Sequence, residues 1–275
     1  MQLVVVIPFL NEERYLPTVL ASVAAQSRLP DRLVLVDDGS NDRSFEIVSE
    51  FAASRPYAVA LSRPRRPVER DRLESASELR AFQWALETTG FEFDIVAKID
   101  ADVSLTPRLF EEVERRFEQD PELGLTGAHL STSTGLGQGV EREPSRPDHI
   151  RGANKFYRRA CYDQIAPLPT ILGWDTIDEF DARRLGWKTV SFDAAGGDPV
   201  QLRPTGTQDG RLRGFRRAGA CAWGYGAAPR HVVLGGIRRM TQRPPLLGGL
   251  NFMAGWLAAG LRGRSRASPE IRAFV

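Results

Sequence analysis

The chain has 275 residues, of which 42% are hydrophobic and 26% charged, a composition typical of a globular protein with a sizeable core. This length suits one large domain, or one domain with an appendage. The formal net charge of +2 is too balanced to indicate a nucleic-acid-binding protein, so no nucleic-acid partner is expected.

Apolar, β-branched runs alternate with helical patterns along the N-terminal part of the chain. The runs at 3–7, 33–36, 59–61 and 95–99 predict buried strands. The patterns between them predict a helix with Asn11 as its N-cap, a second helix around 45–51 and a third over 77–87. Strands that alternate with helices imply an α/β fold with a mostly parallel sheet flanked by helices.

Polar clusters follow the strands at the points where they end: Pro8 to Glu12, Asp37 to Ser40, and Asp100 to Asp102. In such sheets, ligands bind beyond the carboxyl ends of the strands. Asp100 and Asp102 are separated by one residue and offer hard oxygen ligands to Mg2+ or Mn2+. The alternative is a polar strand end whose aspartates cap the next turn.

The middle of the chain is less regular. Residues 63–73 are rich in Arg and Pro and predict an irregular loop, while 130–148 predict a mobile loop over the site. Asp175, Asp178 and Glu179 follow, ahead of a helical pattern that ends near Gly186. On a helix, Asp178 and Glu179 lie one turn from Asp175.

The tail changes character at residues 244–261, which carry no charge and are flanked by arginines on both sides. This pattern favours an amphipathic helical segment over 244–266 that lies on an anionic membrane surface. The alternative is a C-terminal helix packed on the domain or in a dimer interface.

The cysteines and the first apolar run indicate the cellular compartment of the protein. Cys161 and Cys221 have no metal-like spacing and indicate reduced structural thiols, with a disulfide between them as the alternative. The first apolar run is too short for a signal peptide. We therefore expect a cytoplasmic protein, peripheral on the inner face of the cell membrane. Lysine occurs only at positions 98, 155 and 188, which we interpret as a compositional bias towards arginine.

With these motifs in place, the chain resembles family 2 glycosyltransferases, inverting enzymes of the GT-A fold, over roughly residues 1–200. The resemblance implies a Rossmann-like GT-A domain at 1–205, with a nucleotide-binding half at about 1–103 and an acceptor half at about 104–205. Residues 206–275 resemble the basic, helical, membrane-associating tail of bacterial members that build cell-surface polysaccharide.

The resemblance also implies roles for the strand-end residues. Asp102 would bind a metal ion, Mg2+ or Mn2+, and Asp100 would contact the ribose or the water shell of the metal. Asp38 would accept the N–H of a uracil-like base. The other residues expected to shape the nucleotide pocket are Pro8, Asn11 and Glu12.

The catalytic base is implied by spacing within the family pattern. Counting back from Gly186 places it at Asp175, with Asp178 and Glu179 as alternatives, and Trp174 stands where the family usually has Glu. Many members carry a further metal-ligating His, but the corresponding segment, 200–205, has none. Arg203 in that segment could close over a diphosphate, or could be a solvated charge.

The implied reaction is an inverting, metal-dependent transfer of a sugar from a nucleotide-sugar donor to an acceptor hydroxyl. A UDP-sugar is the favoured donor, and the acceptor would be lipid-linked or a growing polysaccharide. One alternative is a catalytically degenerate scaffold in a polysaccharide assembly complex. Another is a sugar nucleotidyltransferase, although the Gly-rich basic loop of such enzymes is missing after the first strand.

Overall fold

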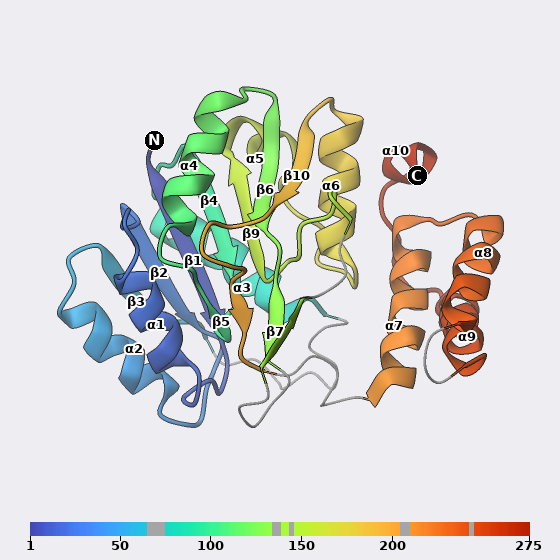
Figure 1. Cartoon of the computed structure of the whole chain (residues 1–275), viewed down its shortest axis with the longest axis horizontal. Coiled ribbons are helices and arrows are strands. Elements are labelled where there is room, and N and C mark those ends of the chain that lie inside the picture. The colour runs from blue at the N-terminus through green and yellow to red at the C-terminus, as the bar shows by residue number, and fades with distance from the viewer. Residues whose placement is uncertain (65–74, 134–138, 143–145, 204–209, 242–244) are drawn as a thin grey trace.

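The structure, a computed structural model, describes residues 1–64, 75–133, 139–142, 146–203, 210–241 and 245–275. An α/β domain forms its larger part, and a group of helices from the C-terminal end packs against one side of that domain (Figure 1). The expected loop at 63–73 lies almost wholly outside the described residues, as does 204–205 at the expected domain boundary.

A seven-stranded sheet forms the centre of the α/β domain, in the order β10-β6-β9-β4-β1-β2-β3. β9 runs antiparallel to β4 and β6, whereas the other pairs are parallel, so the expected mostly parallel mixed sheet is confirmed. Its strands are β1 (Leu3–Phe9), β2 (Arg32–Asp37), β3 (Ala58–Ser62), β4 (Ile95–Ile99), β6 (Leu123–Ala128), β9 (Asn154–Arg158) and β10 (Lys188–Phe192).

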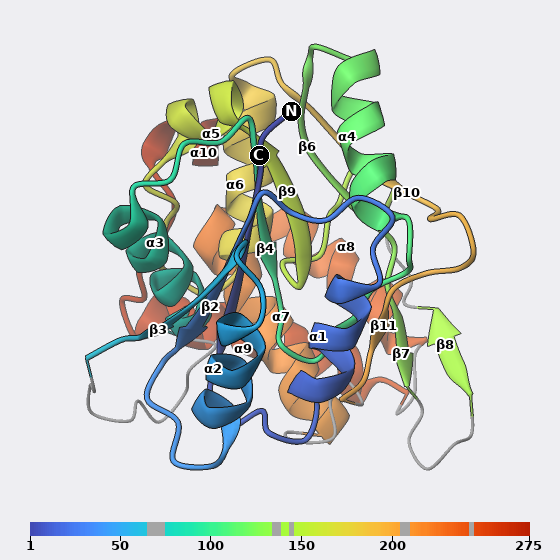
Figure 2. The same ribbon diagram turned by 90° about the vertical axis from the view of Figure 1, so that its left-hand side faces the viewer.

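Helices cover both faces of this sheet (Figure 2), which explains the continuous apolar run of β1. Leu3, Val5 and Ile7 pack in one core with residues of α1 and α4, while Val4 and Val6 pack in another with residues of α3, α5 and α6. The helices of this domain are α1 (Leu16–Ala24), α2 (Ser44–Ala53), α3 (Ser77–Thr89), α4 (Leu109–Gln119), α5 (Arg159–Ile165) and α6 (Trp174–Arg184).

The predicted N-cap at Asn11 is wrong. α1 begins only at Leu16, and its N-cap is Tyr15. Pro17 lies in the first turn, where the fixed φ of proline suits a helix start. Asn11 instead adopts the left-handed conformation, with φ 55°, a conformation that Asn tolerates better than most residues.

A small second sheet contains two strands, β7 and β8, from the segment that the sequence pattern assigned to a loop. Its order is β5-β11-β7-β8, so part of the predicted 130–148 loop is strand instead. These strands are too short and too polar to show an apolar alternation, and 134–138 and 143–145 lie outside the described residues. The strands are β5 (Val103–Ser104), β7 (Ser131–Ser133), β8 (Val140–Arg142) and β11 (Val200–Gln201).

The C-terminal helices are α7 (Gly210–Tyr225), α8 (Pro229–Met240), α9 (Leu247–Leu261) and α10 (Pro269–Phe274). α7 and α9 approach closely, because a Cβ on Gly219 or Gly255 would lie 1.9 Å from a backbone oxygen of the other helix. Ile271 of α10 packs on Ile177 of α6. Within the described part of the chain, every helix is too short or too polar to cross a bilayer.

Candidate active site

The turns after β1 and β2 are hydrogen-bonded to each other. The backbone N–H of Asn11 donates to Ser40 Oγ at 3.0 Å, and Asn11 Oδ1 accepts from the N–H of Asn41 at 2.8 Å. The N–H of Glu12 donates to Ser44 Oγ at 2.7 Å. The positive φ of Asn11 allows this arrangement, which brings two of the predicted nucleotide-binding segments together at one edge of the sheet.

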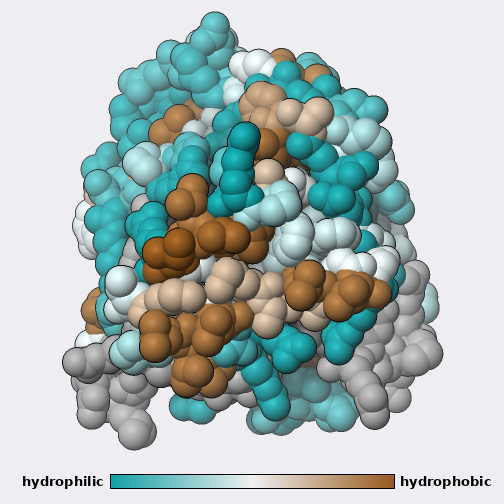
Figure 3. Space-filling model, turned by 90° about the vertical axis from the view of Figure 1, so that its right-hand side faces the viewer, coloured by the Kyte–Doolittle hydropathy of each residue, from teal (hydrophilic) through white to brown (hydrophobic). Residues whose placement is uncertain are grey.

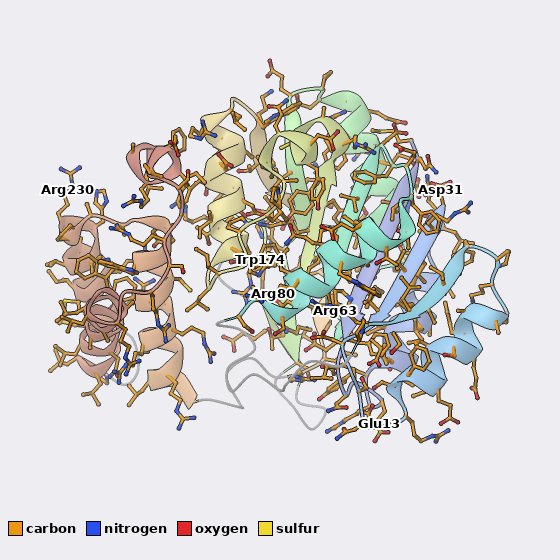
Figure 4. The ribbon with its side chains drawn as sticks, turned by 180° about the vertical axis from the view of Figure 1, so that it is seen from behind. Glu13, Asp31, Arg63, Arg80, Trp174 and Arg230 are labelled. Atoms are coloured by element: carbon orange, nitrogen blue, oxygen red, sulfur yellow. The ribbon has the colours of Figure 1, made fainter. Side chains whose placement is uncertain are left out.

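The two aspartates that end β2 have different surroundings. Asp37 is buried, and its Oδ1 accepts from the backbone N–H of Ser40 at 2.9 Å, which builds the turn. Asp38 instead accepts from Arg63 Nη1 at 2.9 Å, and the Arg63 side chain is itself buried. In Figure 4, Arg63 lies towards the end of the sheet where Glu13 is labelled, whereas Asp31 lies towards the opposite end.

Three carboxylates lie beyond the ends of β1 and β4: Glu12 follows β1, and Asp100 and Asp102 follow β4. Burial raises the pKa of Glu12 to about 7, despite the opposing charge of Arg203 and with a contribution from Asp102. Burial also raises the pKa values of Asp100 and Asp102. Burial therefore opposes the negative charge of these carboxylates, and a bound cation would offset that cost.

Each of these carboxylates has its own partner in the structure. Arg203 donates to Glu12, and Lys98 donates to Asp100. Asp102 accepts from Gln201 Nε2 at 3.3 Å, and its Oδ2 lies 3.9 Å from Arg203 Nε. Arg203, which the sequence left open between a phosphate contact and a solvated charge, thus lies within the acidic site.

The residues of this site fit a divalent cation that keeps most of its coordination for phosphate and water. In the described parts of the chain, no three His, Cys, Asp or Glu side chains are grouped to hold a metal. The structure instead brings Asp102 together with Gln201, whose Oε1 is buried and has no hydrogen-bond partner among the described residues. A carboxylate with an amide oxygen is a hard donor set that suits Mg2+ or Mn2+.

Two buried lysines, Lys98 and Lys155, lie beneath the site, and no role was assigned to them from the sequence. Lys98 of β4 and Lys155 of β9 are cross-strand neighbours, and both are fully buried. Their Nζ atoms lie 5.3 Å and 5.6 Å from the centre of the Trp174 ring, so the ring packs beside two ammonium groups. Glu78 of α3 accepts from Lys98 at 3.3 Å.

Asp178 and Glu179, the alternative bases, are 1% and 0% exposed. Lys155 Nζ lies 2.9 Å from Asp178 Oδ1 and 3.2 Å from Glu179 Oε1, and the Tyr157 hydroxyl donates to Asp178 at 2.6 Å. The N–H of Ile150 donates to Glu179 at 2.7 Å. Burial raises the pKa of Asp178 to about 6 even with Lys155 beside it. These contacts leave little room for an acceptor at either carboxylate.

Asp175 differs from them because its side chain is only partly buried, in the first turn of α6. Burial opposes its ionisation, but the positive charges of Lys155 and Arg151 contribute to outweighing that cost, and the pKa of Asp175 is lowered. Gly152 lets the chain pass close by, since a Cβ there would lie 3.1 Å from Asp175 Cβ and 2.9 Å from the Trp174 ring. Of the three predicted acids, Asp175 is the one whose side chain is not fully buried, and its pKa is lowered.

Comparison with known proteins gives a matching family. The family described as "Glycosyl transferase family 2" matches residues 4–167. The chain is 36% identical, over 119 residues, to an undecaprenyl-phosphate 4-deoxy-4-formamido-L-arabinose transferase of Pectobacterium atrosepticum. That match covers 42% of the chain and 32% of the relative, so the chain matches about a third of the length of this curated relative.

Solved structures share the fold at low identity. A mannosyltransferase from Pyrobaculum calidifontis in complex with GDP-Man and Mn2+ matches with a TM-score of 0.59 and 17% identity, over 99% of this chain and 73% of that one. GalNAc-T7 with UDP, GalNAc and Mn2+ matches with a TM-score of 0.61 and 12% identity, over 96% and 55%. The predicted GT-A fold is thereby confirmed.

Proposed function

The chain belongs to glycosyl transferase family 2, and from this premise we propose that it transfers a sugar from a nucleotide-diphosphate donor to an acceptor hydroxyl, with inversion at the anomeric carbon. The observation that carries this proposal is the convergence of Glu12, Asp100 and Asp102 beyond the carboxyl ends of β1 and β4, with Asp175 as an accessible carboxylate on α6. A UDP-sugar is the favoured donor.

The donor would bind across the two linked turns. Asp38, held by Arg63, would accept the N–H of the base, and Asp100 would contact the ribose. Pro8, Asn11 and Glu12 would shape the pocket between them. Asp102, with Asp100, would hold Mg2+ or Mn2+, which neutralises charge on the departing diphosphate. Arg203 would exchange Glu12 for the phosphate oxygens, which it can bind bidentately.

The acceptor would react at the side of the site that Asp175 lines. Its carboxylate would take the proton of the attacking hydroxyl, and its low pKa keeps it ionised at neutral pH. Asp178 and Glu179 would position Asp175 through Lys155, whose Nζ contacts the backbone oxygen of Asp175 as well as both carboxylates.

The test is the melting temperature of the purified chain with UDP, GDP, TDP and CDP, each with and without Mn2+. A ligand that binds only the native state raises the melting temperature by mass action. We expect one nucleotide to raise the melting temperature only when the metal is present, and we expect this increase to be lost in Asp102→Ala. No shift with any nucleotide would favour the alternative of a degenerate scaffold.

We propose further that residues 206–275 form a membrane-associating part, beside the transferase part at 1–205, and hold the protein on the inner face of the cell membrane. Between 210 and 269 the chain has eleven arginines and no acidic residue, although the whole chain is nearly neutral. Such a basic segment is attracted to anionic lipid. The curated relative's name includes undecaprenyl-phosphate, which supports a lipid-linked acceptor over free polysaccharide.

An exposed apolar surface on α8 and α9 supports this placement (Figure 3). Hydrophobic side chains at helical spacing point outward, while the small residues of α9 face α7 and α8. Monomeric soluble proteins rarely leave such a patch uncovered. The exposed residues are Val233, Leu234, Ile237, Leu246, Leu247, Leu250, Leu257 and Leu261.

A double substitution tests this surface. In Leu234→Glu/Leu250→Glu, we expect co-sedimentation with phosphatidylglycerol vesicles to fall about tenfold or more, because both residues are half or more exposed and would enter the lipid. Leu29→Glu, at an exposed leucine of the α/β domain, serves as the matched control and should bind vesicles like the wild type. Equal binding by all three proteins would contradict the proposed membrane surface.

A further inference from the structure

Gln201 is held beside Asp102 by the backbone of the small second sheet. β11 pairs antiparallel with β5, with Gln201 opposite Val103, and the N–H of Leu202 donates to the carbonyl of Asp102 at 2.7 Å. These bonds fix the side chain of Gln201 next to the Asp102 carboxylate, where Nε2 donates to Oδ2 at 3.3 Å.

The other half of the Gln201 amide has an unusual environment. Oε1 is buried, and among the described residues it accepts no hydrogen bond. A buried acceptor left without a partner costs about 1–3 kcal/mol, and native structures hold few of them. Gln201 therefore brings to the Asp102 carboxylate an amide whose oxygen, a potential metal ligand, forms no bond within the described part of the fold.

The geometry suits a small divalent ion. A half-turn of the amide exchanges Oε1 and Nε2, which places an oxygen where Nε2 now lies, 3.3 Å from Asp102 Oδ2. Neighbouring oxygen ligands of an octahedral ion with metal–oxygen distances of about 2.1 Å lie about 3.0 Å apart. The exchange gives up one long hydrogen bond and moves the NH2 group to the position that Oε1 now occupies, while a cation would bind both the amide oxygen and the Asp102 carboxylate.

We propose that Gln201 is a direct ligand of the divalent cation, through its side-chain oxygen, together with Asp102. This inference rests on the proposed metal-dependent function and names a residue that sequence motifs did not assign. A carboxylate and an amide oxygen are both hard ligands, so the site selects Mg2+ or Mn2+ over softer ions that prefer imidazole or thiolate. Arg203, 3.9 Å from Asp102, leaves the carboxylate when the cation binds.

Two substitutions separate the amide oxygen from the amide N–H. The measured quantity is the affinity for Mn2+, read from the EPR signal of free Mn2+. The nucleoside diphosphate present is the one that raises the melting temperature most. Gln201→Met removes both polar atoms with little change of shape and should weaken Mn2+ binding about tenfold. Gln201→Glu keeps an oxygen and loses the N–H, so Mn2+ binding should match or exceed that of the wild type. If the N–H bond to Asp102 were what matters, Gln201→Glu would bind more weakly than Gln201→Met.

A third substitution reports direct contact. In Gln201→His, electron spin echo spectra of bound Mn2+ should show coupling to an imidazole nitrogen that the wild type lacks. Gln83→Met is the matched control, because Gln83 Nε2 bonds to Leu168 O away from the site. Equal Mn2+ affinity in the wild type and Gln201→Met would overturn the ligand assignment alone. Absence of Mn2+ binding in the wild type would overturn the proposed metal dependence as well.

Discussion

Asp175→Asn is expected to lower the rate of sugar transfer by a factor of about a hundred to ten thousand, the usual contribution of a general base. Asparagine has nearly the same shape as aspartate but cannot accept the proton of the attacking hydroxyl. Donor binding should be unchanged, because the nucleotide-binding turns and Asp102 lie on other elements. The measurements are single-turnover transfer and the thermal shift with nucleotide and Mn2+.

A matched control lies on the same helix. Asp181→Asn removes the ion pair with Arg184 at 2.6 Å, in a partly exposed position of α6, and should leave transfer unchanged. Azide is a nucleophile that needs no base, so it should restore consumption of the donor by Asp175→Asn. Full transfer activity in Asp175→Asn would show that another group is the base, and Asp178 and Glu179 would have to be reconsidered.

The strands and the position of the site could be predicted because they depend on local patterns. Continuous apolar runs mark strands buried on both faces, and the polar residues that end them meet at one edge of a parallel sheet. β4 matches the predicted 95–99 run, and β1 extends the predicted run from Ile7 to Phe9. The turn at Asn11 was mistaken for a helix start because Asn is common in both settings, and only tertiary bonds to Ser40 and Asn41 decide between them.

Which of the three acids of α6 is the best candidate for the catalytic base depends on how deeply each is buried, and the local sequence does not reveal this. Asp175, Asp178 and Glu179 all lie within one turn of a helix, so spacing leaves their roles open. The rotation of α6 against β9 buries Asp178 and Glu179 on Lys155 and leaves Asp175 partly exposed. Gln201 was missed for a related reason, since its relation to Asp102 arises from pairing of two short strands distant in the chain.

The scarcity of lysine in the sequence could have indicated the buried lysines Lys98 and Lys155. In a chain whose basic residues are nearly all arginine, two of the three lysines lie fully buried on adjacent strands beneath the site. An ammonium is compact enough to fit between two carboxylates, whereas a guanidinium needs more room and a planar partner. A lysine that stands where composition favours arginine therefore indicates a position with tight steric limits.

Lys155→Met is expected to destabilise the protein by about 3–5 kcal/mol, because it leaves Asp178 and Glu179 buried with no ammonium between them. The loss in the free energy of unfolding caused by Lys155→Met should be larger at higher pH. The pKa of Asp178 is already raised to about 6 in the fold, so the folded state binds a proton more tightly than the unfolded state, and stability falls as pH rises from about 4 to 6. Without Lys155 the pKa of Asp178 is raised further, so the pH range over which stability falls extends above pH 6.

Urea unfolding of Lys155→Met and the wild type at pH 5.5 and pH 8 measures this difference, which should be larger at pH 8. Lys188→Met is the matched control: Lys188 is 50% exposed, in surface ion pairs with Asp120 and Glu122, and its loss should cost less than about 1 kcal/mol at either pH. In folded Lys155→Met, the acid limb of transfer activity should move to higher pH, because Lys155 is the largest positive influence on Asp175. A stability loss that is small and independent of pH would mean that Lys155 does not neutralise the carboxylates of α6.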